Sequence, residues 1–342
     1  MSIFWGILIA ILTFGVMIFL HEFGHYFAAR LCHVKVLEFA VGMGPRLFSH
    51  TSQKTGIQYS LCALPIGGYT AMQGEDGEDP DPGALVNRPR WQRLIVLLAG
   101  SFMNIVSGMI AMFIYLSITG IVGSCVVADF RENAVSNAWL QEGDQIVAID
   151  GRKMVDYTDV ANTIMIDGIE AIDIEVIRNG ETLLLEEVSF STEEQEGVLV
   201  GVLDFRFLGV KPSLSVLIKQ TFTQSFATVK MIYKTFIQLF TGRFGINGVT
   251  GPVGTVSVIA EAASMGFLPI LYLFVFISLN LGVMNLLPFP ALDGGRILFI
   301  LVEMVRRKPL NPKFEGYVHM AGMAVLLAFM AVVAVLDVMK LA

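Results

Sequence analysis

Charged residues are scarce in this chain of 342 amino acids. They make up 15% of the sequence, whereas about 25% is usual for soluble proteins. Hydrophobic residues account for 54%, and the mean hydropathy is +0.67. This composition excludes a disordered tail and argues against a purely soluble protein, because so much apolar surface needs either a very large core or a membrane.

Cysteine is also scarce. The three cysteines, Cys32, Cys62 and Cys125, are odd in number and contain no CxxC pair, so they predict neither a disulfide framework nor a zinc knuckle. A basic segment is missing from the first residues, and no small-residue cleavage site precedes His21. We therefore expect the first apolar run to remain in the mature protein and not to be removed as a secretory signal.

What the chain does have is long apolar runs. Residues 3–20, 94–122 and 267–287 contain no charged residue, and each is long enough to cross about 30 Å of hydrocarbon. A shorter fourth run covers residues 320–336 and is followed by Asp337. These runs predict a polytopic α-helical membrane protein with four transmembrane helices.

An acidic segment separates the second run from the third. Between Cys125 and Phe205 there are 18 acidic residues and four basic ones, which predicts a water-soluble module. Strand patterns flank the turns Asp150-Gly151 and Asn179-Gly180, and residues 156–165 read as a short helix. The module is therefore expected to be a small α+β domain.

The residues after this module predict an amphipathic helix and then a loop. Apolar side chains recur every three or four positions over residues 222–240, with lysines between them. We expect this helix to lie at the membrane interface or to pack on the soluble domain. Glycines follow closely in the loop, at Gly242, Gly245, Gly248, Gly251 and Gly254.

Basic residues predict the orientation in the membrane. They concentrate in the loop 21–93 and in the segment 296–313 after the third run, so both segments are expected to be cytoplasmic. The acidic domain and both chain ends are then expected on the outer side.

The first apolar run leads directly into His21-Glu22-Phe23-Gly24-His25. On a helix, positions i and i+4 share a face, so both imidazoles can bind one zinc ion with Glu22 beside its water. A catalytic zinc needs a third protein ligand and an open position. Asp293, between apolar residues and two glycines, is the candidate, although alone it could equally be a helix N-cap.

Asp293 belongs to a second motif, Asn285-Leu-Leu-Pro288-Phe-Pro290-Ala-Leu-Asp293-Gly294-Gly295. The two motifs, on separate spans with a soluble domain between them, resemble the site-2 protease family of intramembrane zinc metalloproteases, in its bacterial RseP-type branch. The resemblance covers nearly the whole chain. It implies that His21, His25 and Asp293 hold Zn²⁺ and that Glu22 is the general base. It also implies that Asn285, in the same motif as Asp293, holds the substrate backbone, and we place Pro288 of that motif in the substrate-binding region.

Other segments match the same family. Residues 140–151 resemble the core of a PDZ domain of the kind found in bacterial membrane proteases; an unspecified β-rich domain is the alternative. Residues 65–72 resemble a membrane-associated β segment that would pair with substrate through Gly67, Gly68, Tyr69, Thr70, Ala71 and Met72; the alternative is a plain surface hairpin. Ser101 stands where the family usually has proline. We expect Asn104 and Asn280 to be hydrogen-bonding contacts between helices.

Four regions follow from these patterns. Residues 1–122 would hold the first two spans and the β segment, 123–208 the PDZ-like domain, 209–265 the amphipathic helix and glycine-rich loop, and 266–342 the last two spans. The resemblance implies a multi-pass protein of the bacterial cell membrane, with its active site toward the cytoplasm and its PDZ-like domain outside. Its partners would be lipid and single-span membrane proteins, and no nucleic acid.

The function implied by the resemblance is cleavage of transmembrane segments after a first cut on the outer side, for example in anti-sigma factors or remnant signal peptides. Two alternatives remain from the residues themselves. A zinc transporter or sensor would use the same ligands but not Glu22. A membrane scaffold would leave both metal motifs without a role. The residues do not indicate the oligomeric state.

Overall fold

The computed structural model describes residues 3–75, 77, 79–195, 198–241 and 250–341. Gly242, Gly245 and Gly248 of the predicted glycine-rich loop lie outside these residues. The chain divides into two compact units, one formed by Met1–Gly108 with Thr250–Ala342 and the other by Met109–Val249.

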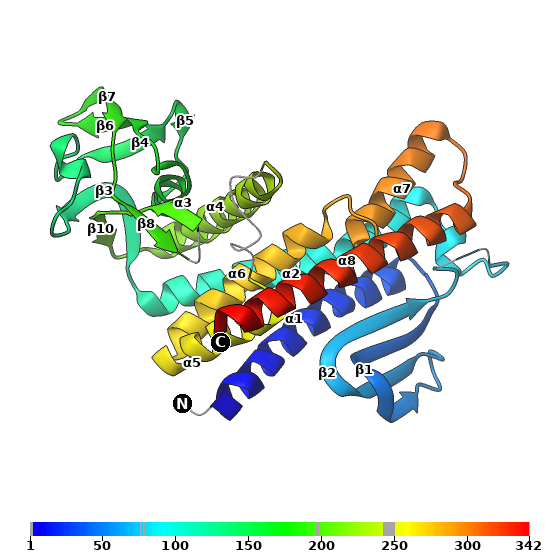
Figure 1. Cartoon of the computed structure of the whole chain (residues 1–342). Helices are drawn as coiled ribbons and strands as arrows, with labels where there is room; N and C mark the ends of the chain where they lie inside the picture. Colours follow the sequence, from blue (N-terminus) through cyan, green and yellow to red (C-terminus); the bar gives the residue numbers. More distant parts are fainter. Residues whose placement is uncertain (1–2, 76, 78, 196–197, 242–249, 342) are drawn as a thin grey trace. The chain divides into compact units, whose positions relative to one another are not determined.

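Among the described residues, four helices are long and apolar enough to cross a membrane, as the sequence predicts. They are α1 (Ile3–Leu31), α2 (Arg90–Thr119), α6 (Phe267–Asn285) and α8 (Pro312–Leu341) (Figure 1). Two shorter helices, α5 (Pro252–Met265) and α7 (Asp293–Arg306), also belong to the first unit. Helices α1, α6 and α8 all contact α5.

The fourth apolar run is closed by Asp337 in the sequence, but helix α8 continues through this residue. Asp337 is buried and accepts hydrogen bonds from the N–H groups of Gly251 (3.1 Å) and Gly254 (2.8 Å) at the start of α5. The first amides of a helix have no partner within that helix. Asp337 therefore caps helix α5, and its charge does not end helix α8, to which it belongs.

The β segment is a curled antiparallel sheet of two long strands, β1 (Val36–Thr51) and β2 (Gln58–Met72). Residues 36–41 of β1 pair with 68–72 on one side and with 58–61 on the other. Residues 68–72 therefore form an edge, and among the described residues no third strand pairs with it.

Glu38 is the buried polar centre of this sheet. It accepts hydrogen bonds from Ser60 (2.5 Å) and from both Nε and Nη2 of Arg46 (2.9 and 2.7 Å). Burial opposes ionisation of Glu38, but the hydrogen bonds from Ser60, Arg46 and Tyr69 hold the pKa of this carboxyl below its usual range.

The second unit contains an antiparallel sheet in the order β10-β3-β4-β6-β7, with β5 pairing to β4. Its strands are β3 (Val122–Phe130), β4 (Gln145–Ile149), β5 (Arg152–Lys153), β6 (Ile172–Arg178), β7 (Glu181–Val188) and β10 (Phe205–Val210). A separate pair joins β8 (Thr192–Gln195) to β9 (Val198–Gly201).

The local signals of this unit are where the sequence predicts them. Asp150-Gly151 and Asn179-Gly180 form the tight turns β4–β5 and β6–β7, and all four residues have positive φ, as such turns require. Helix α3 (Tyr157–Asp167) begins after Asp156, whose side chain accepts from the N–H groups of the first turn.

Helix α4 (Leu214–Phe240) is amphipathic, but the face that it buries is largely polar. Gln224 and Thr228 are buried, Lys230 forms an ion pair with Asp159 of α3 (2.9 Å), and Lys234 pairs with another α3 carboxylate. Large apolar side chains are exposed along the helix at Leu214, Ile218, Phe222, Phe226, Tyr233 and Ile237. Of the two expected environments, the structure shows packing on the soluble domain, through the polar face.

Candidate metal centre

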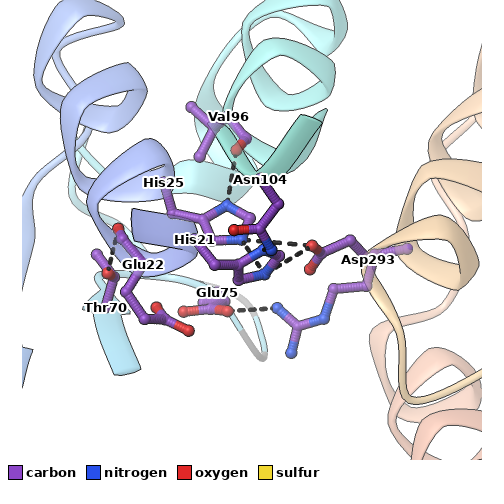
Figure 2. A network of polar contacts seen from close by, with 9 residues as sticks. His21, Glu22, His25, Thr70, Glu75, Val96, Asn104 and Asp293 are labelled. Atoms are coloured by element: carbon purple, nitrogen blue, oxygen red, sulfur yellow. Dashed lines mark hydrogen bonds and ion pairs between the residues drawn. The ribbon is translucent and has the colours of Figure 1, made fainter. Parts of the chain in front are cut away.

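The two histidines of the HExxH motif lie one turn apart on α1, which continues as a helix through the motif. Their Nε2 atoms are 3.2 Å apart. The third side chain of the cluster, a carboxylate, comes from α7. Asp293 is the first residue of that helix; Leu292 occupies the N-cap position, so Asp293 is not the cap itself. Its carboxylate oxygen Oδ2 lies 3.3 Å from His21 Nε2 and 3.4 Å from His25 Nε2 (Figure 2).

The three atoms form a triangle of the size that a zinc ion requires. With bonds of about 2.0–2.1 Å to nitrogen and oxygen, a tetrahedral zinc separates its ligand atoms by about 3.3–3.4 Å. The observed separations, 3.2, 3.3 and 3.4 Å, match this spacing. Asp293 Oδ2 is buried and has no hydrogen-bond donor among the residues that the structure describes, which is costly unless a cation satisfies it. The residues present therefore fit a zinc ion.

The opposite ring nitrogens of the histidines are held by α2. His25 Nδ1 donates to the backbone carbonyl of Val96 at 2.8 Å, which leaves Nε2 with its lone pair directed at the site. The side-chain amide of Asn104 lies 3.2 Å from His21 Nδ1. Asn104 is thus more than a contact between helices, because it touches a candidate metal ligand.

Glycine allows α1 and α2 to approach each other at the motif. A Cβ atom on Gly24 would lie 2.3 Å from the Ala99 carbonyl oxygen, and one on Gly100 would lie 2.2 Å from His25 Nε2. Real Cβ atoms do not come this close to other heavy atoms. The glycines therefore set the distance between the helix that carries the histidines and the helix that orients them.

Glu22 lies beside the edge segment of β2. Thr70 Oγ1 donates to the Glu22 backbone carbonyl at 3.0 Å, and a Cβ atom on Gly68 would lie 3.3 Å from Glu22 Cγ. Figure 2 shows Glu22 and Thr70 next to the histidines. The structure thus brings the middle of the predicted substrate segment to the HExxH motif.

The other predicted substrate residues have different surroundings. Gly67 faces Met43, and Met72 is buried with its N–H donating to Glu75 at 3.3 Å. Half-buried Asn285 is the last residue of α6, and exposed Pro288 belongs to the loop that leads to Asp293.

Two polar contacts near the site have no signal in the sequence. Arg296, on the first turn of α7, donates to Glu75 at 2.5 Å and so ties the end of β2 to the helix that carries Asp293. His319 of α8 accepts a hydrogen bond from the Ala291 N–H at 3.2 Å. The partners are 221 and 28 residues apart, so only the fold brings them together.

Comparison with known proteins identifies the family. The profile of Peptidase family M50 matches residues 9–329. A candidate zinc metalloprotease of Fusobacterium nucleatum subsp. nucleatum is 36% identical over 341 residues, which cover 98% of each chain. Zinc metalloprotease RasP of Shouchella clausii is 28% identical over an alignment of 420 positions, gaps included, which covers 97% of this chain and 98% of the relative. Regulator of sigma-W protease RasP of Bacillus subtilis is 27% identical over an alignment of 417 positions, which covers 97% of each chain. The chain therefore belongs to Peptidase family M50, the site-2 protease family, and is a zinc metallopeptidase with membrane-spanning helices.

Proposed function

We propose that the protein cleaves transmembrane segments of other membrane proteins, with zinc held by His21, His25 and Asp293. The observation that carries this proposal is the triangle of two Nε2 atoms and one carboxylate oxygen, with edges of 3.2–3.4 Å. Two nitrogens, one oxygen and an open fourth position are the ligand set of a catalytic zinc site.

A zinc ion held by these three residues would act as a Lewis acid and lower the pKa of water at the site to near neutrality. Glu22 is the proposed general base, which would hold a proton and deliver it to the leaving amine. Val96 and Asn104 keep the two imidazoles in the required orientation through contacts of 2.8 and 3.2 Å at Nδ1.

The substrate must be extended before it can be cut, because a helix uses its own amides and lipid excludes water. We propose that the edge segment Gly68–Met72 pairs with an unwound stretch of substrate. The hydrogen bond from Thr70 to the Glu22 carbonyl supports this role, since it holds the edge segment beside the proposed general base. Asn285 would hold the substrate backbone, with Pro288 in the same loop.

The proposed substrates are single-span membrane proteins already cut on the outer side, such as anti-sigma factors or remnant signal peptides. The name of the Bacillus subtilis relative, regulator of sigma-W protease RasP, supports a regulatory role of this kind. The basic loops support a cytoplasmic active site in the cell membrane. Labelling of introduced cysteines from each side tests this orientation; a soluble domain labelled only from the cytoplasm would reverse it.

We further propose that the sheet domain of residues 123–208 is an extracytoplasmic PDZ-like domain that excludes bulky substrates. Replacing residues 126–205 with a short Gly-Ser linker tests this. A size filter predicts that the uncut substrate is now cleaved. Poor cleavage of even the trimmed substrate would instead indicate that the domain captures a new carboxyl terminus.

Two variants test the centre itself. Glu22→Gln should retain zinc and lose cleavage of a tagged single-span substrate, whereas Asp293→Ala should lose both. Zinc is counted by elemental analysis of the purified protein. A Glu22→Gln variant that cleaves normally would contradict the proposed base. Native protein that binds zinc but cleaves no substrate would instead indicate a transporter or sensor.

A further inference from the structure

The loop that connects α6 to Asp293 contains a residue in an unfavourable backbone conformation. Ala291, two residues before Asp293, has φ +88°. This region of backbone space favours glycine, and other residues remain there only where the surroundings hold them. Because the chain direction at Ala291 determines where α7 begins, it also determines where the Asp293 carboxylate lies.

Helix α7 packs against one part of this loop. A Cβ atom on Gly294 would lie 2.1 Å from the Leu287 carbonyl oxygen, and one on Gly295 would lie 2.5 Å from the Phe289 carbonyl oxygen. Both distances are too short for any side chain. The two glycines after Asp293 therefore let the loop fold closely over the first turn of its own helix.

Helix α8 packs against the loop at Pro290 and Ala291. Gly322 of α8 lies so close that a Cβ atom there would be 2.4 Å from Pro290 Cβ. One turn earlier, His319 Nδ1 accepts the Ala291 N–H at 3.2 Å. Contacts on successive loop residues thus fix the strained part of the loop to the fourth membrane-spanning helix.

His319 belongs to α8, a candidate membrane span, and directly precedes the apolar run 320–336. Ionisable residues in or beside a span usually have a functional role. To accept the Ala291 N–H, the ring must be neutral, with its proton on Nε2. A leucine of similar size would satisfy the bilayer better but would leave this N–H without its acceptor.

We propose that His319 is a positioning residue for the metal centre: by accepting the Ala291 N–H it holds the loop so that Asp293 meets both imidazoles. The inference rests on the zinc ligands proposed above. His319 acts through Ala291 and does not touch the metal or the substrate.

The test compares two substitutions at this position. In His319→Asn the amide oxygen can take the place of Nδ1, so the acceptor is kept, whereas His319→Leu removes it. One hydrogen bond corresponds to about a tenfold change in an equilibrium. We expect His319→Leu to increase hydrogen exchange of residues 286–292 about tenfold in metal-free protein, and to accelerate zinc release to a chelator to a similar extent.

His319→Asn should stay within about twofold of the native protein in both measurements, because the Ala291 N–H keeps an acceptor. Ala291→Gly removes the backbone strain, so adding His319→Leu to it should change zinc release less than in the native background. This double-mutant comparison separates support of the strained residue from a general effect on α8.

Asp337→Asn is the matched control. It also weakens a contact between α8 and backbone amides, but those amides belong to α5. It should leave zinc release unchanged. Equal acceleration in Asp337→Asn, or no change in exchange and zinc release in His319→Leu, would overturn the inference. Full zinc retention in Asp293→Ala would instead refute the ligand set on which the inference rests.

Discussion

Gly100→Ala is expected to disable the metal centre although the change adds a single methyl group. The new Cβ would lie 2.2 Å from His25 Nε2 and 2.7 Å from both neighbouring ring carbons. Since real Cβ contacts are not shorter than 3.0 Å, the ring or the helix must move by about 0.8 Å. His25 cannot retreat freely, because its other nitrogen is bound to Val96 at 2.8 Å.

The size of the effect follows from this displacement. A misplacement of about 1 Å in a catalytic constellation can cost about 100-fold in rate. We therefore expect kcat/KM to fall by about 30- to 100-fold, with a reduced zinc content. The substitution should not destabilise helix α2 itself, because alanine is more favourable than glycine inside a helix by about 1 kcal/mol in water.

The assay is cleavage of a tagged single-span substrate by purified protein in detergent, with zinc measured in the same samples. Two glycines serve as controls. A Cβ on Gly108, on the same helix, would lie 3.0 Å from side-chain carbons of Leu279, which can shift, and one on Gly316 would have no atom within 4 Å. Alanine at these two positions should reduce activity slightly or not at all. Native activity in Gly100→Ala, or equal losses in all three variants, would refute the reasoning.

Three further outcomes are expected. Glu75→Arg should lower cleavage several-fold, because it removes the 2.5 Å ion pair with Arg296. The double variant Glu75→Arg with Arg296→Glu should recover part of the lost cleavage. No recovery would argue against an electrostatic link between the two residues. Asp337→Asn should lower stability by about 0.5–2 kcal/mol, the usual value of a helix cap, seen as a lower apparent Tm in detergent. Arg178→Ala should destabilise the second unit by up to about 3 kcal/mol, because Asp144 is fully buried and would lose its partner. Limited proteolysis of the full-length protein measures this loss, and unchanged proteolysis would show that the pair contributes little.

The sequence predicts those parts of the fold that depend on neighbours along the chain. Apolar runs of membrane length indicate spanning helices whatever they pack against, and the described part of the chain has four helices long and apolar enough to span. Asp-Gly and Asn-Gly favour tight turns through their own backbone preferences, and the hairpins of the second unit use them. The i, i+4 spacing of His21 and His25 is likewise enough to place both imidazoles on one face of a helix.

Contacts between distant segments are what the sequence could not supply. Asp337 reads as the end of a span because a charge in lipid is costly, but the amides of Gly251 and Gly254 offset that cost. Asn104 reads as a contact between helices, yet its amide is 3.2 Å from His21 Nδ1, across 83 residues of chain. The sequence left open whether α4 lies at the membrane interface or packs on the acidic domain, and the ion pairs of Lys230 and Lys234 with α3 depend on residues about 70 positions away.

The hydrogen bond from Thr70 to the Glu22 carbonyl affects which substrates can be cleaved. It ties the edge segment of β2 to the helix that carries the proposed base, so a paired substrate would meet the metal at a fixed distance from its first ladder bond. Main-chain pairing at such an edge recognises the backbone of the substrate and not its side chains. Discrimination among substrates would then depend on how readily a transmembrane helix unwinds and on whether its outer part has been trimmed. Substrates should accordingly share helix-breaking residues near the cut more than they share a sequence motif.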